Sequence, residues 1–260
     1  NISIKYICGN SSVGKKISSY DNSLKSKYPF LNYKEAIFSP STGIFDSHSF
    51  IHSLSRDFQS LGGNILLGNE TLNVEQSSKG YEVLIEDKNT ENQFVVITNI
   101  LVNSAGLNAV HIAGLIDEGN TYQEEFVKGE YYIYQGKERL ENLIYPTPSE
   151  NSLGLHATID LGKGIRFGPS AYVVDEIDYN LSSHRKSSFL EAVQSYWPSI
   201  QAEDLTPGYS GIRPKLKGIK DFIIDSGTVN DNQYVNVLGY ASPGLTSSLA
   251  LGIEVSNLIE

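Results

Sequence analysis

NILVNSAG, residues 99–106, is the stretch that decides the fold, because a strand-like apolar run ends here in three small residues. A short apolar run of this kind is typical of a strand buried in a sheet. A strand that ends in small residues, here Ser104-Ala105-Gly106, suggests part of a nucleotide-binding α/β domain.

A helix and a meander of short strands precede this stretch. Asp46 is a good N-cap, and Gly62-Gly63 would stop the helix. Between them, apolar residues recur at helical spacing: Phe50, Ile51, Leu54, Phe58 and Leu61. Strand-like runs then follow at Asn64–Leu67, Thr71–Glu75, Tyr81–Asp87 and Gln93–Thr98. This order of elements predicts part of a nucleotide-binding α/β domain.

The residues from about 125 to 205 have a different pattern. Short strands separated by turn residues are expected at Tyr131–Gln135, Leu143–Tyr145, Gly154–Asp160 and Ile165–Phe167. They indicate an antiparallel sheet. A helix with Phe189, Val193 and Tyr196 on one face follows, and Pro198 ends it.

The last part of the chain returns to α/β character. Phe222–Ile224 and Tyr234–Leu238 are expected strands. Ser242-Pro243-Gly244 then opens a final helix that carries Leu245, Leu249 and Ile253, and we expect Ser242 as its N-cap and Pro243 as its first residue.

Composition excludes several classes of protein. The 260 residues are 40% apolar and carry a net charge of −10, which argues against a nucleic-acid groove. No apolar stretch approaches the length of a transmembrane helix, so no membrane span is expected. The single cysteine, Cys8, rules out a disulfide framework. A polar segment with little periodicity occupies residues 1–34.

Two motifs resemble known sites without matching them. Gly9–Lys16 nearly matches a phosphate-binding P-loop, but Lys16 stands where the motif needs Ser or Thr, so a polar surface loop is the favoured interpretation. His48 and His52 have the spacing of zinc ligands on a helix, but Ser49 replaces the glutamate of the hydrolytic motif and no third ligand is evident. No metal site is predicted.

Two other features are stronger candidates. Arg213 lies between Gly and Pro in a rigid segment, where it either binds a carboxylate ligand or forms a structural ion pair. The helix start at Gly239–Thr246 either presents N–H groups to an anion or is an ordinary capped helix. The residues alone leave both alternatives open.

Eight ordered segments together resemble a known family. They are SPSTGIFDSH (39–48), VNSAGLNA (102–109), KGEYY (128–132), LIYPTP (143–148), LGLHATIDLG (153–162), RFGPSA (166–171), GIRPKL (211–216) and SPGLTSSLA (242–250). This pattern is similar to the FAD-dependent D-amino-acid-oxidase-like superfamily, and within it to the L-2-hydroxyglutarate dehydrogenases and their bacterial relatives.

The resemblance implies a domain organisation. The fold class is α/β plus α+β: the remnant of a Rossmann-like FAD-binding domain with an antiparallel substrate domain. FAD-binding parts are expected at 35–124 and 206–260, around a substrate domain at 125–205. The strands at Asn99–Asn103 and Tyr234–Leu238 should share a sheet. The family's GxGxxG motif is absent from the 260 residues. We therefore interpret the chain as the C-terminal part of a flavoenzyme, and expect it to lose FAD on its own.

The resemblance also assigns residues to roles. Thr71, Ser104, Ala105 and Gly106 would lie against the adenine and phosphates of FAD. Ser242, Pro243, Gly244, Leu245 and Thr246 would lie beneath the flavin pyrimidine ring. Arg213 would bind the substrate carboxylate, and Tyr131, Tyr145 and His156 would cover the substrate. The base is expected in the family's N-terminal half, and His156 is the candidate base within this chain.

The implied reaction is hydride transfer from Cα of an L-2-hydroxy acid to flavin N5, which leaves a 2-oxo acid. Alternatives are a related oxidase of another 2-hydroxy or amino acid, and a domain without cofactor or activity. Expected partners are the small-molecule acid and an unidentified electron acceptor. The location would be cytoplasmic in a bacterium and mitochondrial in a eukaryote.

Overall fold

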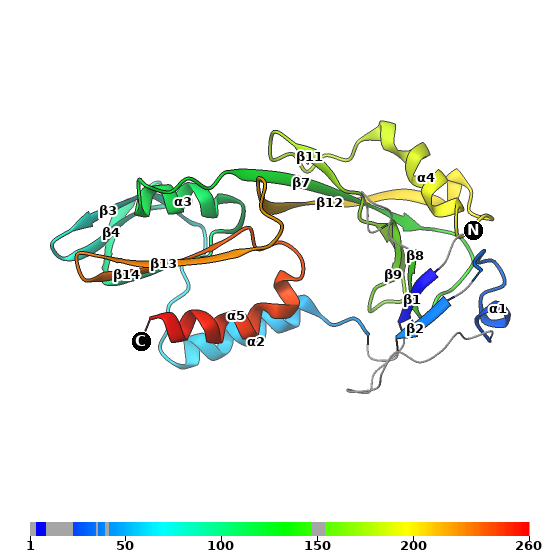
Figure 1. The fold of residues 1–260 in the computed structure, drawn as a ribbon, viewed down its shortest axis with the longest axis horizontal. Coiled ribbons are helices and arrows are strands. Elements are labelled where there is room, and N and C mark those ends of the chain that lie inside the picture. Colours follow the sequence, from blue (N-terminus) through cyan, green and yellow to red (C-terminus); the bar gives the residue numbers. More distant parts are fainter. Residues whose placement is uncertain (1–3, 9–22, 35, 40–41, 147–153, 260) are drawn as a thin grey trace. The chain divides into compact units, whose positions relative to one another are not determined.

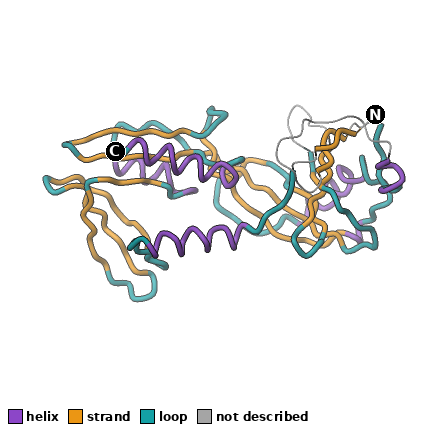
Figure 2. The backbone as a smooth tube through the Cα atoms, turned by 90° about the horizontal axis from the view of Figure 1, so that it is seen from below, coloured by secondary structure: helices purple, strands orange, loops and turns teal. Residues whose placement is uncertain are grey.

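The computed structural model describes residues 4–8, 23–34, 36–39, 42–146 and 154–259. The chain divides into two compact units. Unit 1 consists of Asn1–Ser53, Lys128–Tyr172 and Asp178–Gly211, and unit 2 consists of Leu54–Val127, Val173–Ile177 and Ile212–Glu260. The elements are labelled in Figure 1, and Figure 2 shows the helix that runs to the C-terminus, α5 (Gly244–Leu258).

Unit 1 contains most of an eight-stranded, mostly antiparallel sheet, of which residues 124–127, 173–174 and 212–216 fall in unit 2. Its strand order is β11-β7-β10-β9-β8-β1-β2, and β12 pairs with β7. The strands are β1 (Ile4–Cys8), β2 (Ala36–Ser39), β7 (Glu124–Tyr134), β8 (Leu143–Pro146), β9 (His156–Ile159), β10 (Ile165–Gly168), β11 (Tyr172–Val174) and β12 (Leu205–Leu216). The antiparallel pairing of β7, β8, β9 and β10 confirms the expected antiparallel sheet.

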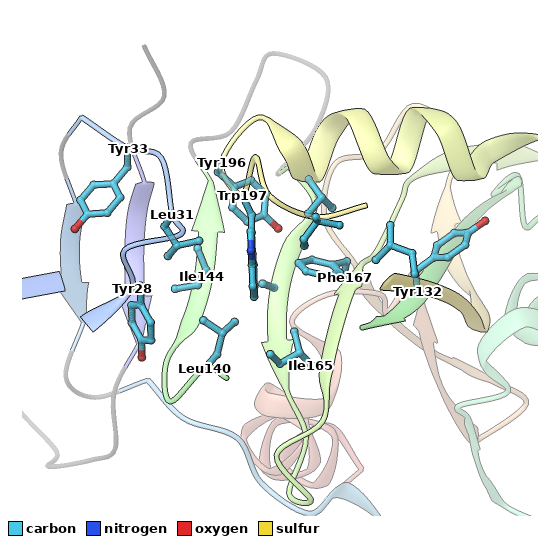
Figure 3. Close-up of a cluster of buried hydrophobic side chains, with 14 of the residues drawn as sticks. Tyr28, Leu31, Tyr33, Tyr132, Leu140, Ile144, Ile165, Phe167, Tyr196 and Trp197 are labelled. Carbon is cyan, nitrogen blue, oxygen red and sulfur yellow. The ribbon is translucent and has the colours of Figure 1, made fainter. Parts of the chain in front are cut away.

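One face of this sheet is buried against an aromatic core (Figure 3). Ile144, Ala157, Phe167 and Tyr132 are fully or almost fully buried there. Their partner is Trp197, whose ring lies 5.7 Å from that of Phe167. The helix α4 (Lys186–Gln194) contributes Phe189 and Val193, as expected from their spacing, with Tyr196 just beyond its end.

The N-terminal segment corrects a prediction. Its described residues 23–34 are not simply polar, because Tyr28, Leu31 and Tyr33 follow the short helix α1 (Ser23–Lys27) into the same core. The Tyr28 hydroxyl donates a 2.6 Å hydrogen bond to Asn142 Oδ1. The described residues from 36 to 53 also group with unit 1, since β2 pairs in parallel with β1.

Unit 2 contains two three-stranded sheets. One has the order β3-β4-β5 and the other β13-β14-β6. The strands are β3 (Asn69–Ser77), β4 (Gly80–Asp87), β5 (Gln93–Thr98), β6 (Ile100–Asn103), β13 (Ile223–Val229) and β14 (Asn232–Leu238). The helix α3 (Ala109–Ile116) contributes Ile112 and Ile116 to a core shared with Val83 and Tyr234, so it packs against both sheets.

The predicted pairing in unit 2 is confirmed: β6 and β14 are parallel neighbours, with Leu101 opposite Tyr234. The prediction of a strand at Asn64–Leu67 was wrong. The helix α2 (Ser47–Ser60) ends just before the expected glycines. Gly68, at φ +73°, then turns the chain, and the next strand, β3, starts only at Asn69. The Asp46 cap is confirmed, because Ser49 N–H donates to its Oδ1 at 3.0 Å.

The apolar faces expected for two helices are exposed in the described part of the chain. In α2, Leu54 is 41% and Phe58 51% exposed. In α5, Leu249 is 58% and Ile253 66% exposed. The periodicity therefore identified the helices correctly, but these faces have no covering element among the described residues.

Candidate functional site: a sheet edge in unit 2 and a sheet face in unit 1

The cofactor candidates of unit 2 follow two neighbouring parallel strands. Asn103 ends β6 opposite Asn236 of β14. Ser104-Ala105-Gly106 comes directly after β6, and Gly239–Thr246 comes after β14. Because the carboxyl ends of parallel neighbours lie at one edge of a sheet, both segments start from the same edge. In open α/β sheets, ligands bind at this edge.

A buried amide pair shapes the turn after β6. Asn103 and Asn236 are 3% and 1% exposed. Asn103 Nδ2 donates to Asn236 Oδ1 at 2.9 Å and to the carbonyl of Ala109 at 2.8 Å, and the Ala105 N–H donates to Asn103 Oδ1 at 3.2 Å. The side chain of Asn103 therefore fixes the path of the Ser104–Gly106 turn from the strand to α3. Asn103 was not among the site residues predicted from the sequence. A polar Asn at the end of an apolar strand was the feature of the sequence that could have identified it.

A cavity of about 520 Å³ adjoins this turn. Thr71, Ser104 and Ala105, three of the residues that the resemblance assigned to FAD, line it, whereas Gly106 is not part of its wall. The wall also contains polar residues that were not predicted from the sequence: Asn69, Glu70, Asn108 and His111. Asn69 Oδ1 is buried there without a hydrogen-bond partner among the described residues. A volume of this size suits a small ligand, and an unpaired acceptor suits a ligand N–H or O–H group. The wall therefore fits part of a nucleotide.

The start of α5 corrects the predicted cap. The helix begins at Gly244, Pro243 occupies the N-cap position, and no side chain caps it. Ser242, the expected N-cap, lies one residue before the N-cap position. The Gly244 N–H donates a 2.7 Å hydrogen bond to the carbonyl of Ala241 and is therefore not free for a ligand. The N–H groups of Leu245 and Thr246 have no intrahelical acceptor at a helix start, so they are the groups left to face a ligand.

The structure brings Tyr131, Tyr145 and His156 together on one face of the unit 1 sheet. His156 lies opposite Gly168, and Ile144 opposite Ala157, which places Tyr145 opposite His156. The rings of Tyr145 and His156 stack at 3.8 Å. Gly168 sits against Tyr131, and a Cβ there would lie 2.6 Å from Tyr131 Cδ1, so only glycine fits. This polar and aromatic face is opposite the Trp197 core.

Two residues on the same face were not predicted as site residues. Arg166 pairs in register with Thr158, and its guanidinium carbon lies 5.6 Å from the ring of Tyr209. Tyr209 stacks on Tyr131 at 4.6 Å. Arg166 stands between the core residues Ile165 and Phe167, so strand alternation directs it to the opposite face. That alternation was the signal available in the sequence.

Asp160 holds Arg166 in place. Arg166 Nη2 donates to Asp160 Oδ2 at 2.8 Å, and the Gly164 N–H donates to Asp160 Oδ1 at 2.8 Å. Burial raises the pKa of Asp160, but these hydrogen bonds and the guanidinium charge outweigh it and lower the pKa below its ordinary value. Burial lowers the pKa of Arg166, and its bonds with Tyr209 and Asp160 outweigh that effect, so the pair is charged at neutral pH.

Arg213 lies on β12 and is half-buried. It forms no ion pair with any carboxylate in the described ranges, so the structural-ion-pair alternative gains no support there. By the division into units, Arg213 belongs to unit 2, whereas Tyr131, Tyr145 and His156 belong to unit 1. Leu216, the last residue of β12, packs closely against Gly239. A Cβ on Gly239, which has φ +66°, would lie 2.8 Å from the Leu216 side chain, so this contact requires glycine.

The structure adds no support for the remaining sequence candidates among the residues that it describes. Gly9–Lys16 lies outside the described residues. His48 and His52 join no cluster of three or more metal-ligating side chains within the described ranges. No helix in that same part of the chain is long and apolar enough to cross a bilayer.

Comparison with known proteins identifies the family. The model of the FAD dependent oxidoreductase (DAO) family matches residues 12–258. The chain belongs to this family. This confirms the resemblance inferred from the eight segments, and with it FAD as the cofactor of the intact protein.

Individual relatives agree with this family assignment. The mitochondrial L-2-hydroxyglutarate dehydrogenase of Arabidopsis thaliana is 32% identical over 274 residues, which cover 88% of this chain and 57% of that protein. The enzyme of the same name from Indibacter alkaliphilus is 27% identical, over 88% of this chain and 66% of its own length. The FAD-bound L-alpha-glycerophosphate oxidase of Mycoplasma pneumoniae shares the fold, with a TM-score of 0.66 at 24% identity over 79% of this chain and 53% of the other. The chain thus spans less than two thirds of each of these relatives.

The Asn103 side chain provides a test of the unit 2 edge. Asn103→Ala removes both donated hydrogen bonds and leaves the buried Asn236 Oδ1 without its donor. We expect the free energy of unfolding measured in urea to fall by about 1–3 kcal/mol. Asn92→Ala, in the exposed turn before β5, is the matched control and should change it by less than about 0.5 kcal/mol. Equal stability of the two variants would contradict the proposed role of Asn103.

The Asp160–Arg166 pair predicts a pH dependence. A carboxyl whose pKa is lowered by folding adds stability above its unfolded pKa, and this stability is lost as the pH falls through the folded pKa. The free energy of unfolding should therefore decrease on acidification below about pH 5, and less steeply in Asp160→Asn than in the parent chain. Asp175→Asn, at an exposed carboxylate, should keep the parent slope. Identical slopes for the parent and Asp160→Asn would show that folding does not lower the pKa of Asp160.

Proposed function

We propose that this chain forms the substrate face and part of the cofactor site of an FAD-dependent dehydrogenase that oxidises an L-2-hydroxy acid, in the first place L-2-hydroxyglutarate, to the 2-oxo acid. The observation that carries the proposal is the sheet face of unit 1, where Tyr131, Tyr145 and His156 gather opposite a buried core. The names of the relatives from Arabidopsis thaliana and Indibacter alkaliphilus support the choice of acid.

In this proposal the edge of the unit 2 sheet holds the cofactor. FAD supplies a two-electron acceptor when it is bound. The turn Ser104–Gly106 and Thr71 would contact its adenosine and phosphate portion, next to the cavity with the unpaired Asn69 Oδ1. The N–H groups of Leu245 and Thr246 would face the flavin pyrimidine ring, where a helix N-terminus stabilises developing negative charge.

The substrate would be held by its carboxylate and deprotonated at its hydroxyl group. Arg213 provides a planar guanidinium with no carboxylate partner in the described part of the chain, which suits a bidentate pair with a carboxylate ligand. His156 is 9% exposed and stacks on Tyr145, so its imidazole is fixed in orientation. It is the proposed base that takes the hydroxyl proton. Tyr131 and Tyr145 would cover the carbon chain and exclude water.

The cofactor content of the isolated chain is the first test. Because GxGxxG is absent from the 260 residues, much of the binding energy for the FAD pyrophosphate should be missing. We expect the purified, unreconstituted chain to contain far less than one FAD per chain, measured by flavin absorbance. Absorbance close to one equivalent per chain would show that the pyrophosphate is held by residues other than that motif.

Arg213 is the second test, made in the intact, FAD-loaded protein. Arg213→Lys keeps the charge and loses the bidentate fork, so kcat/KM for a 2-hydroxy acid should fall roughly 30- to 150-fold, mainly through KM, at unchanged flavin content. Lys217→Gln, at an exposed position after the same strand, should leave kcat/KM within about twofold. A structural role for Arg213 predicts the opposite: a lower melting temperature and a normal KM in the folded fraction.

A further inference from the structure

Arg166 supplies a cation to the substrate face. Among the positions of β7, β8, β9 and β10 that share this face, it is the only Lys or Arg. It lies opposite Thr158, and His156 lies opposite Gly168. His156 and Arg166 are therefore diagonal neighbours, whose Cα atoms in an antiparallel pair are roughly 7–8 Å apart. A chain of a few carbon atoms is long enough to reach from one side chain to the other.

The guanidinium of Arg166 keeps donors for a ligand. Its Nη2 donates to Asp160 Oδ2 and it also bonds with Tyr209, but an arginine has five N–H donors in total, so donors remain for a ligand. Its side chain is 36% exposed and lines a cavity of about 520 Å³ in unit 1. Thr158 and Tyr209 also line this cavity, and Tyr209 continues the aromatic surface of Tyr131. Asp46 and His48 lie on its wall as well, and Asp46 is already engaged by the N–H and hydroxyl of Ser49.

We propose that Arg166 is a specificity-determining residue that binds the second carboxylate of a five-carbon 2-hydroxy dicarboxylic acid. The inference rests on the proposed function, since it extends the same substrate face. With the hydroxyl-bearing carbon beside His156, the remaining methylene groups would lie along the stacked rings of Tyr131 and Tyr209, and the distal carboxylate would pair with the planar fork of Arg166. Asp160 is then a positioning residue, which fixes the direction of that fork.

A purely structural role makes a different prediction. If the Arg166–Asp160 pair only closes the β9–β10 turn, removing it lowers stability and affects every substrate equally. If Arg166 binds the distal carboxylate, the loss is confined to dicarboxylic substrates. The ratio of activities on a diacid and on a monoacid of equal chain length therefore separates the two roles.

The experiment uses the intact, FAD-loaded protein and two substrates, L-2-hydroxyglutarate and L-2-hydroxypentanoate. Arg166→Gln should lower kcat/KM for the diacid about 10- to 100-fold, through KM, and change that for the monoacid by less than about threefold. Lys163→Gln, in the turn between β9 and β10, is the matched control and should preserve the ratio. The double variant Arg166→Gln/Asp160→Asn leaves no unpaired charge, and should show the same selective loss if the single variant folds poorly.

The outcomes distinguish this inference from the proposed function. A wild-type protein that oxidises neither acid overturns the proposed function and the inference with it. A wild-type protein that oxidises the diacid, with Arg166 variants that lose activity equally on both acids or on neither, overturns the inference alone. Asp160→Asn keeps the cation and loosens its orientation, so it should weaken the preference for the diacid less than Arg166→Gln does. A larger loss of that preference in Asp160→Asn than in Arg166→Gln would contradict the assignment of the distal carboxylate to Arg166.

Discussion

The two-residue alternation of side chains in β7, β8, β9 and β10 is the constraint on which the substrate face depends. Ile144, Ala157, Phe167 and Tyr132 point to the Trp197 core, so their neighbours Tyr145, His156, Arg166 and Tyr131 must point the other way. A register shift of one residue would exchange the two faces and expose the core. Burial of the aromatic cluster, worth about 1.5–3 kcal/mol for each large side chain, therefore also fixes the residues that face the substrate.

In unit 2, the candidate cofactor-binding residues are brought together by strand pairing. Parallel pairing of β6 with β14 brings two chain segments to one edge, although they are far apart in the sequence. The buried amides of Asn103 and Asn236 then connect the strands to the turn and to α3. A buried polar network of this kind is stable only when its members are paired, which ties the shape of the turn to the pairing of the strands.

Much of the fold followed from local signals in the sequence. The Asp46 cap and the glycines at 62–63 marked α2, and alternating or apolar runs marked the strands from β3 to β6. Tyr28, Leu31 and Tyr33 were missed because single aromatic residues in a polar segment have no period. The Asn103–Asn236 pair could not be seen, since its partners are 133 residues apart. Tyr131, Tyr145 and His156 came from the family resemblance, and only strand register showed that they share a face with Arg166.

A crystal structure of the FAD-loaded protein with 2-oxoglutarate, the product of the proposed reaction, would test the substrate face itself. We predict that the 2-oxo acid lies against the sheet face of Tyr131, Tyr145 and His156, with one carboxylate within hydrogen-bond distance of Arg166. A 2-oxo acid bound elsewhere, with this face in contact only with water or protein, would contradict the assignment of this face to the substrate.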